Sequence, residues 1–263
     1  MFLRLLSRQW ILTTLLVVLA MGVMARLGIW QLDRLEQRRT FNARVQAQLD
    51  QPALDLSQAL QTGAASQREL EGMEYRDIFV SGEYDFSQEV ALRNQVYENQ
   101  LGVHLFTPLM ISGSEHTILI NRGWVPFNDF TQGNLDRYRE EGQVTVRGVI
   151  RVSQERPELG RAVDPTPGPD GQRLESLLAA NVERIAAQTP YPLLPVYIQQ
   201  SADSTWSGPP HRADLELTLT EGSHLGYALQ WFSFALILGI GYPFYVRRES
   251  GTGKSSAQYV RSA

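Results

Sequence analysis

Two uncharged, apolar segments near the ends of the chain constrain its fold more than any other feature. Residues 9–25 are 17 consecutive uncharged positions, and residues 225–246 are 22. As helices they would measure roughly 26 Å and 33 Å, close to the ~30 Å hydrocarbon core of a bilayer. Residues 1–30 are therefore predicted to hold a short tail and a first transmembrane helix, and residues 224–246 a second transmembrane helix.

A cleaved signal peptide stays open as an alternative for the first segment. Arg4 and Arg8 precede it, and Val23-Met24-Ala25 loosely fits the small-residue pattern of cleavage sites. The apolar run is longer than the core of about 7–15 residues that signal peptides use, which favours a retained helix. Both interpretations send the chain beyond residue 30 to the same side of the membrane.

Charge is distributed unevenly along the chain. Residues 1–25 and 224–263 hold six basic residues and one acidic residue, whereas residues 26–223 hold 18 basic and 27 acidic residues. Because basic residues collect on the cytoplasmic side, both termini are predicted to be cytoplasmic and the middle domain extracytoplasmic. The acidic middle argues against a nucleic-acid partner. No Arg- and Ser-rich transit region precedes the first segment, so we expect a multi-pass protein of the bacterial plasma (inner) membrane, in contact with the lipid bilayer.

The middle of the chain has the composition of a β domain. Segments rich in β-branched and aromatic residues, separated by Gly, Asn, Ser or Pro, predict about five sequential antiparallel strands. These segments are residues 75–84, 89–97, 102–112, 116–126 and 143–152. SGSE, at 112–115, predicts a tight hairpin turn.

Helical and irregular segments complete the predicted fold. The first helix is expected to continue to about Gln51-Pro52, and residues 174–188 have the spacing of an amphipathic helix. Residues 156–172 predict a proline- and glycine-rich surface loop, and residues 193–200 and 213–219 return to strand composition. The predicted fold class is an α+β membrane protein. Two transmembrane helices flank an extracytoplasmic, mainly antiparallel β domain that can curl into a barrel and carries one or two helices.

Sequence motifs give no support for an enzyme. The chain has no cysteine and no G-x-S-x-G, H-E-x-x-H or dinucleotide-binding glycine pattern. Its four histidines, at positions 104, 116, 211 and 224, are scattered. No nucleophile, base and oxyanion site can be assembled from these patterns, so we expect a protein without catalytic residues.

A polar cluster begins the second apolar segment. His224, Tyr227 and Trp231 lie at i, i+3 and i+7, so they share one helical face, with Gln230 beside it. One interpretation is interfacial, with a histidine and a tyrosine at the level of the lipid headgroups. The other is functional, because ionisable residues in membrane helices mark sites, and a neutral imidazole can bind a metal, including haem iron.

Two further clusters stand out. Trp30 and Arg34 are four residues apart where the first helix leaves the bilayer, beside Gln31; a membrane-interface role and a binding role both remain open. The second cluster, INRGWVP at 120–126, ends a predicted strand. Its structural interpretation is a strand end with Trp124 in the core and Arg122 exposed.

These clusters, with two others, resemble the Surfeit locus protein 1 family of cytochrome c oxidase assembly factors. The resemblance rests on five segments in the family's order: LGIWQLDR (27–34), YRDIFVSGEYD (75–85), GVHLFTPL (102–109), ILINRGWVP (118–126) and HLGYALQWFSFA (224–235). Each segment is a weak signal alone, but five in order between two membrane helices are specific. Arg26 departs from the small or apolar residues that the family places before the first of these motifs.

The resemblance implies a role in the maturation of haem-copper oxidases. It implies transient binding of haem a, with oxidase subunit I and haem a synthase as partners. His224 corresponds to the family's second-helix histidine and would bind the haem iron. The remaining expected haem-binding residues are Tyr227, Trp231, Trp30 and Arg34. The expected partner-docking residues are Asn121, Arg122, Gly123 and Trp124.

Two further hypotheses remain beside haem delivery. The first is a haem-free scaffold that stabilises an oxidase subunit during assembly. The second is a membrane-bound enzyme, which the missing catalytic motifs disfavour. The predicted organisation is a tail and first transmembrane helix at 1–30, the extracytoplasmic domain at 31–223, the second helix at 224–246 and a basic cytoplasmic tail at 247–263.

Overall fold

The computed structural model describes residues 5, 7–157, 164, 173–204, 206, 208–215 and 217–259, without the side chains of 250–259. The chain divides into two compact units, one made of Met1–Arg44 with Thr218–Ala263 and the other of Val45–Leu217. The division between the two units falls at residues 44/45 and 217/218, within the segment 31–223 that was predicted as one domain. Residues 31–44 and 218–223 therefore belong to the unit that contains the long helices. The predicted tail at 247–263 lies partly outside the described residues, and up to Tyr259 it continues the second helix.

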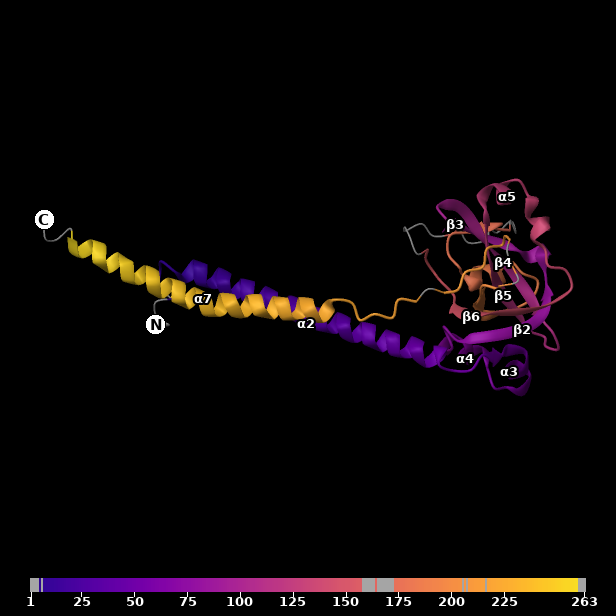
Figure 1. Cartoon of the computed structure of the whole chain (residues 1–263), viewed down its shortest axis with the longest axis horizontal. Coiled ribbons are helices and arrows are strands. Elements are labelled where there is room, and N and C mark those ends of the chain that lie inside the picture. Colours follow the sequence, from indigo (N-terminus) through magenta and orange to yellow (C-terminus); the bar gives the residue numbers. More distant parts are fainter. Residues whose placement is uncertain are drawn as a thin grey trace. The chain divides into compact units, whose positions relative to one another are not determined.

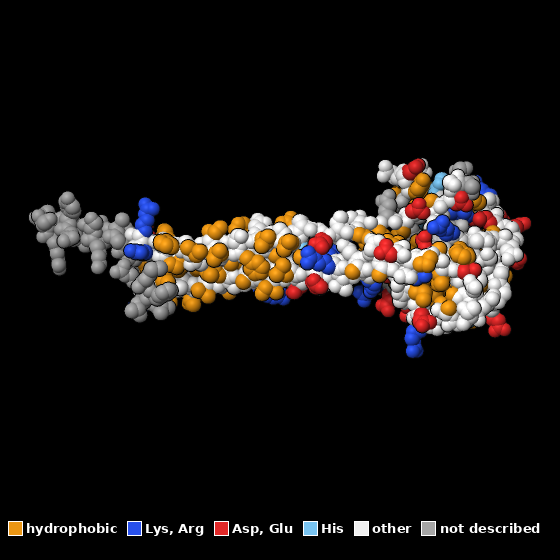
Figure 2. Space-filling view, turned by 60° about the horizontal axis from the view of Figure 1, so that its bottom comes forward, with side chains coloured by type: hydrophobic (Ala, Val, Ile, Leu, Met, Phe, Trp, Pro, Cys, Tyr) orange, Lys and Arg blue, Asp and Glu red, His pale blue; other side chains and the backbone are white. Residues whose placement is uncertain are grey.

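Two long helices form the first unit. Helix α2 (Ile11–Leu49) and helix α7 (His224–Tyr259) run side by side (Figure 1). Both contain stretches long and apolar enough to cross a membrane, within Ile11–Leu49 and His224–Glu249. Hydrophobic side chains cover much of their visible surface (Figure 2). The predicted fold class is confirmed to the extent that two long apolar helices flank a mainly sheet domain, and α2 ends at Leu49, close to the predicted end near Gln51.

The two helices are antiparallel and pack along a narrow line of contact. As residue numbers increase along α2, the residues contacted on α7 have decreasing numbers. The contacts are Thr14 Oγ1 with Tyr242 Oη at 2.7 Å, Met21 beside Gly239, and Gly28 beside Phe232. A Cβ atom at Gly28 would lie 2.6 Å from the Phe232 ring, so the glycine permits the close approach. The seven-residue spacing of Thr14, Met21 and Gly28 is the repeat of a coiled-coil interface.

Five strands of the second unit close into a barrel. They pair in the order β2-β6-β8-β5-β4, and β4 pairs again with β2. Their bounds are β2 (Asp77–Tyr84), β4 (Gln100–Ile111), β5 (Thr117–Pro126), β6 (Gln143–Val152) and β8 (Leu193–Gln200). Only β5 and β8 pair in parallel within this ring. The predicted barrel is confirmed, and so is the turn at 112–115, where Ser114 N donates to Ile111 O at 3.2 Å.

Shorter elements cover the barrel. Strand β3 (Val90–Tyr97) pairs with β4, and the two-residue strands β1 (Leu54–Asp55) and β7 (Ser176–Leu177) pair with β2 and β3. Helices α3 (Leu56–Thr62) and α4 (Gln67–Gly72) contribute Leu56, Ala59 and Leu70 to the apolar interior. The remaining short helices are η1 (Phe86–Gln88), α5 (Phe127–Thr131), η2 (Asn134–Tyr138) and α6 (Val182–Ala186).

Two predicted elements are wrong. Within 174–188 only Val182–Ala186 is helical, because Leu177 joins a strand pair and packs with Val182 and Ile185 on the outside of the barrel. Among the described residues of 213–219 there is no strand. The backbone pairing lies just before that segment, where His211 bridges Trp124. Most of the predicted loop at 156–172 lies outside the described residues.

Arg122 on β5 is fully buried at one end of the barrel interior. Ile118 and Ile120 face the interior, and Arg122 continues this alternating row. The pairing of β5 with β4 jumps from Asn121 to Gly123, so a β-bulge leaves Arg122 without an opposite residue. Its guanidinium lies 5.0 Å from the ring centres of both Tyr84 and Phe86.

Two carboxylates neutralise this buried cation. Arg122 Nη1 donates to Glu89 Oε2 at 3.0 Å, and Nη2 donates to Glu140 Oε1 at 3.1 Å and to the Tyr138 carbonyl. Arg212, itself nearly buried, donates to the same Glu140 oxygen at 2.6 Å. The network therefore ties together four segments that are distant in sequence.

We predict that Arg122→Met strongly destabilises the fold. Removing one partner of a buried ion pair leaves the other charge uncompensated, which costs about 3–5 kcal/mol of the free energy of unfolding. Denaturant unfolding of the full chain in detergent, followed by tryptophan fluorescence, measures the loss. Arg147→Met is the matched control, because the Arg147–Asp77 pair is exposed and should contribute under about 1 kcal/mol. If both variants lost the same free energy of unfolding, the buried network would not stabilise the fold more than an exposed ion pair does.

His104 on β4 gives the domain a defined response to acid. Burial lowers the pKa of His104 to about 4, and its Nδ1 lies 3.1 Å from Asn121 Nδ2. The unfolded chain takes up this proton near pH 6.5. Between pH 4 and 6.5 the unfolded state thus binds more protons than the folded state, so stability falls as the pH falls through that range.

We predict that His104→Gln flattens this pH dependence. The shifted histidine should account for roughly 2–3 kcal/mol of stability lost between pH 6.5 and pH 4. The measurement is the denaturation midpoint at several pH values, compared as a slope and not as an absolute stability. His116→Gln, on the turn before β5, serves as the control. An unchanged slope in His104→Gln would show that other groups govern the acid response.

Candidate functional site

His224, the first residue of α7, presents one ring nitrogen free for a ligand. Its Nδ1 lies 2.8 Å from Oε1 of Gln31 on α2. An amide oxygen only accepts hydrogen bonds, so Nδ1 carries the proton, and in the neutral ring Nε2 keeps its lone pair. Among the described residues, no hydrogen-bond partner reaches Nε2. This is the arrangement in which an imidazole binds a metal through Nε2.

Gly222 lies beside the His224 imidazole in a backbone conformation that favours glycine. Its φ of +68° is in the left-handed region that favours glycine. A Cβ atom at this position would lie 3.4 Å from His224 Cδ2 and 3.6 Å from Nε2. Any side chain here would therefore contact the edge of the ring that a metal must approach.

The other predicted haem-binding residues lie on the same two helices. Tyr227 is 51% exposed, and Trp30 is 43% exposed. Trp231 is half-buried and meets Phe234 edge-on, with ring centres 6.2 Å apart. The Arg34 guanidinium lies 5.6 Å from the Trp30 ring centre, which confirms the face that their spacing predicted. The binding roles of these residues stay predictions.

Arg34 is also tied to its own helix. Its Nη1 donates to Gln37 Oε1 at 2.9 Å, on an exposed part of α2. Because neither residue is buried, the guanidinium can reach a carboxylate ligand at little cost. Arg39 on α2 and Glu221, which precedes α7, form a second contact nearby, with two hydrogen bonds of 2.9 and 3.0 Å.

Sequence reasoning missed the role of Gln31. The sequence places Gln31 beside Trp30, but a glutamine on a helix carries no signal of its partner. Only the register and rotation of the two helices show that it meets His224. The Arg39–Glu221 pair was missed for the same reason.

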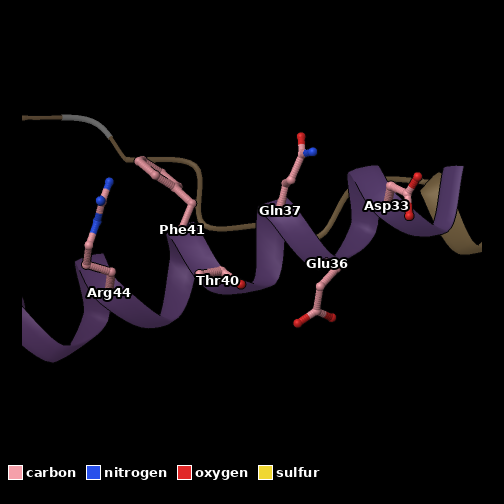
Figure 3. Close-up of a pocket in the computed structure, with 6 residues that line it drawn as sticks. All are labelled: Asp33, Glu36, Gln37, Thr40, Phe41 and Arg44. Carbon is pink, nitrogen blue, oxygen red and sulfur yellow. The ribbon is translucent and has the colours of Figure 1, made fainter. Parts of the chain in front are cut away.

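A hollow of about 570 Å³ beside α2 does not form a convergent site (Figure 3). It is lined by Asp33, Glu36, Gln37, Thr40, Phe41 and Arg44. All six residues come from one helix, and Glu36 points away from the side on which Gln37 and Phe41 lie (Figure 3). The hollow is open and mixes both charges, so it does not define a ligand.

The four residues expected to dock a partner are buried in the second unit. Asn121 is 6%, Arg122 0% and Trp124 3% exposed, and Gly123 is also buried. The interpretation of Trp124 as a core residue is confirmed, whereas that of Arg122 as an exposed strand-end residue is wrong. The β-bulge and the two carboxylates explain why this arginine is inside. Their role in docking a partner protein remains a prediction. Because they are buried, they would affect a partner only by positioning the neighbouring segments that are exposed to it.

One such segment runs alongside the end of β5. Trp124 N donates to His211 O at 2.9 Å, and His211 N donates to Trp124 O at 2.7 Å. Gly123 has a φ of +116°, and a Cβ atom there would lie 2.5 Å from His211 O. The NRGW motif thus permits a backbone segment to pair closely with β5.

Metal-binding side chains do not cluster in the described part of the chain. No group of three or more His, Asp or Glu residues there could hold a metal ion. A single imidazole nitrogen suits an iron whose other ligands come from a macrocycle, because haem needs only axial ligands from the protein. His224 therefore fits haem better than it fits a bare metal ion.

Comparison with known proteins assigns the family. The sequence model of the SURF1 family matches residues 18–236. A SURF1-like protein of Rickettsia conorii is 26% identical over 90% of this chain and 92% of its own length. The human Surfeit locus protein 1 is 26% identical over 86% of this chain and 73% of its own length. A SURF1-like protein of Caenorhabditis elegans is 26% identical over 80% and 67%. Because the family match covers well over half of the chain, the protein belongs to the SURF1 family.

Proposed function

We propose that this protein is a membrane-anchored assembly factor for haem-copper (cytochrome c) oxidase that binds haem a and aids its insertion into subunit I. The observation that carries the proposal is the His224 imidazole, whose Nδ1 is engaged by Gln31 and whose Nε2 is free. Membership of the SURF1 family supports it, and the motif resemblance makes His224 the counterpart of the family's second-helix histidine. Haem a is the cargo in this proposal, held only until it is delivered.

Each predicted haem-binding residue on the two helices would have a distinct part in holding the cargo. His224 Nε2 supplies one axial ligand, and Gly222 leaves room for the approach of the iron. The exposed rings of Trp30 and Tyr227 offer apolar surface to the macrocycle. The Arg34 guanidinium suits a propionate carboxylate, with which it can form two parallel hydrogen bonds.

The proposed setting is the plasma (inner) membrane of a bacterium. Two apolar helices and bacterial relatives support a bacterial membrane protein. The basic residues near the chain ends favour cytoplasmic termini, which places the barrel outside the cytoplasm. In this arrangement haem a synthase supplies the cargo and oxidase subunit I receives it. Neither step makes or breaks a covalent bond in haem, so the protein needs no catalytic residues.

We predict that replacing His224 removes most of the bound haem. The protein is purified in detergent from cells that make haem a, and the Soret absorbance per chain is measured. His224→Ala should lose most of this absorbance. His224→Gln should do the same, although its amide can still bond to Gln31, because an amide is a poor iron ligand. His116→Ala, in the second unit, should keep the wild-type spectrum.

Two outcomes would contradict haem delivery. An unchanged Soret band in both His224 variants would remove the ligand assignment. A colourless wild-type protein that still restores oxidase activity to cells lacking their own copy would favour the haem-free scaffold. Circular dichroism of each variant confirms that the helices remain folded.

A further inference from the structure

We propose that Gln31 is a positioning residue that fixes the tautomer of His224 and so keeps Nε2 available to iron. The inference rests on the proposed function for its haem step, whereas its tautomer step is a property of the protein without haem. The contact joins side chains 193 positions apart, at a distance of 2.8 Å between His224 Nδ1 and Gln31 Oε1.

The first step concerns the single proton of a neutral imidazole. That proton resides on Nδ1 or on Nε2, and only the unprotonated nitrogen can bind a metal. An acceptor held against Nδ1 draws the proton there. Without this acceptor the ring would populate both tautomers, and the molecules with a protonated Nε2 could not bind iron.

The second step concerns how firmly the acceptor is held. Gln31 is half-buried and lies on the same line of contact as Gly28, three residues earlier, where α2 meets Phe232. On the other side of Gln31, the Arg39–Glu221 pair joins α2 to the residues just before α7. The acceptor is therefore placed between one contact with α7 and one with the residues just before it, which limits its movement relative to His224.

The third step separates positioning from a purely structural contact. A hydrogen bond that only held the helices together would be replaceable by any contact of similar strength. An acceptor that sets the tautomer is replaceable only by another acceptor. Gln31→Glu keeps an oxygen at this place and Gln31→Leu does not, so the two variants should differ.

The test combines a measurement without haem and a measurement with haem. Full-length protein labelled with ¹⁵N-histidine in detergent is examined by NMR, which reports which ring nitrogen of His224 carries the proton. Wild type and Gln31→Glu should carry it on Nδ1, and Gln31→Leu should move it toward Nε2. Titration with haem a should then show affinity weaker in Gln31→Leu by the factor by which its Nδ1-protonated fraction falls, and near wild type in Gln31→Glu.

Gln230→Leu is the matched control, because Gln230 is exposed on α7 and receives the same change. It should alter neither measurement. A proton on Nε2 in the wild type, or an unchanged tautomer in Gln31→Leu, would overturn the proposal whatever happens to haem. A shifted tautomer with unchanged haem affinity would overturn the positioning role. A wild type that shows the expected tautomer but binds no haem would overturn the proposed function and, with it, the haem step alone.

Discussion

The pairing of α2 with α7 is the interaction on which the candidate site depends. His224 and Gln31 belong to opposite ends of the sequence, and they meet because the helices are antiparallel and in register. Gly28 against Phe232 and Thr14 against Tyr242 set that register. In a bilayer the hydrophobic effect does not drive the association of helices. Close packing at small residues and interhelical hydrogen bonds stabilise the pair instead. The same contacts that anchor the chain thus also build the site.

The barrel depends on a different constraint, the burial of a charged network at one end of its interior. Arg122, Glu89, Glu140 and Arg212 carry two charges of each sign, so the network is neutral as a whole. Taking such charges out of water is costly, and a neutral set with several hydrogen bonds offsets this cost only when all members are in place. The network thus couples the bulge at Arg122, the turn before Glu140 and the segment at Arg212.

Local patterns predicted the helices and the strands, but not the contacts between distant residues. The apolar runs and the alternation of residues 143–152 predicted the two helices and a barrel strand. The helix predicted at 174–188 failed because Leu177 pairs in a strand with β3, while only Val182–Ala186 forms a helix packed in the same apolar cluster. The burial of Arg122 could not be predicted, since it depends on a bulge that shifts one residue of β5.

The surroundings of a single axial ligand bear on whether a haem would be kept or passed on. Globins and peroxidases hold a resident haem with one axial histidine, so the number of protein ligands alone does not decide between storage and transfer. Of the histidines in the described residues, His224 alone lies on either long helix, and Gln31 occupies its other ring nitrogen. In the proposed site, His224 would supply one axial bond, beside the exposed rings of Trp30 and Tyr227. That exposure, and not the count of ligands, is what would let a receiving protein exchange its own ligand for His224.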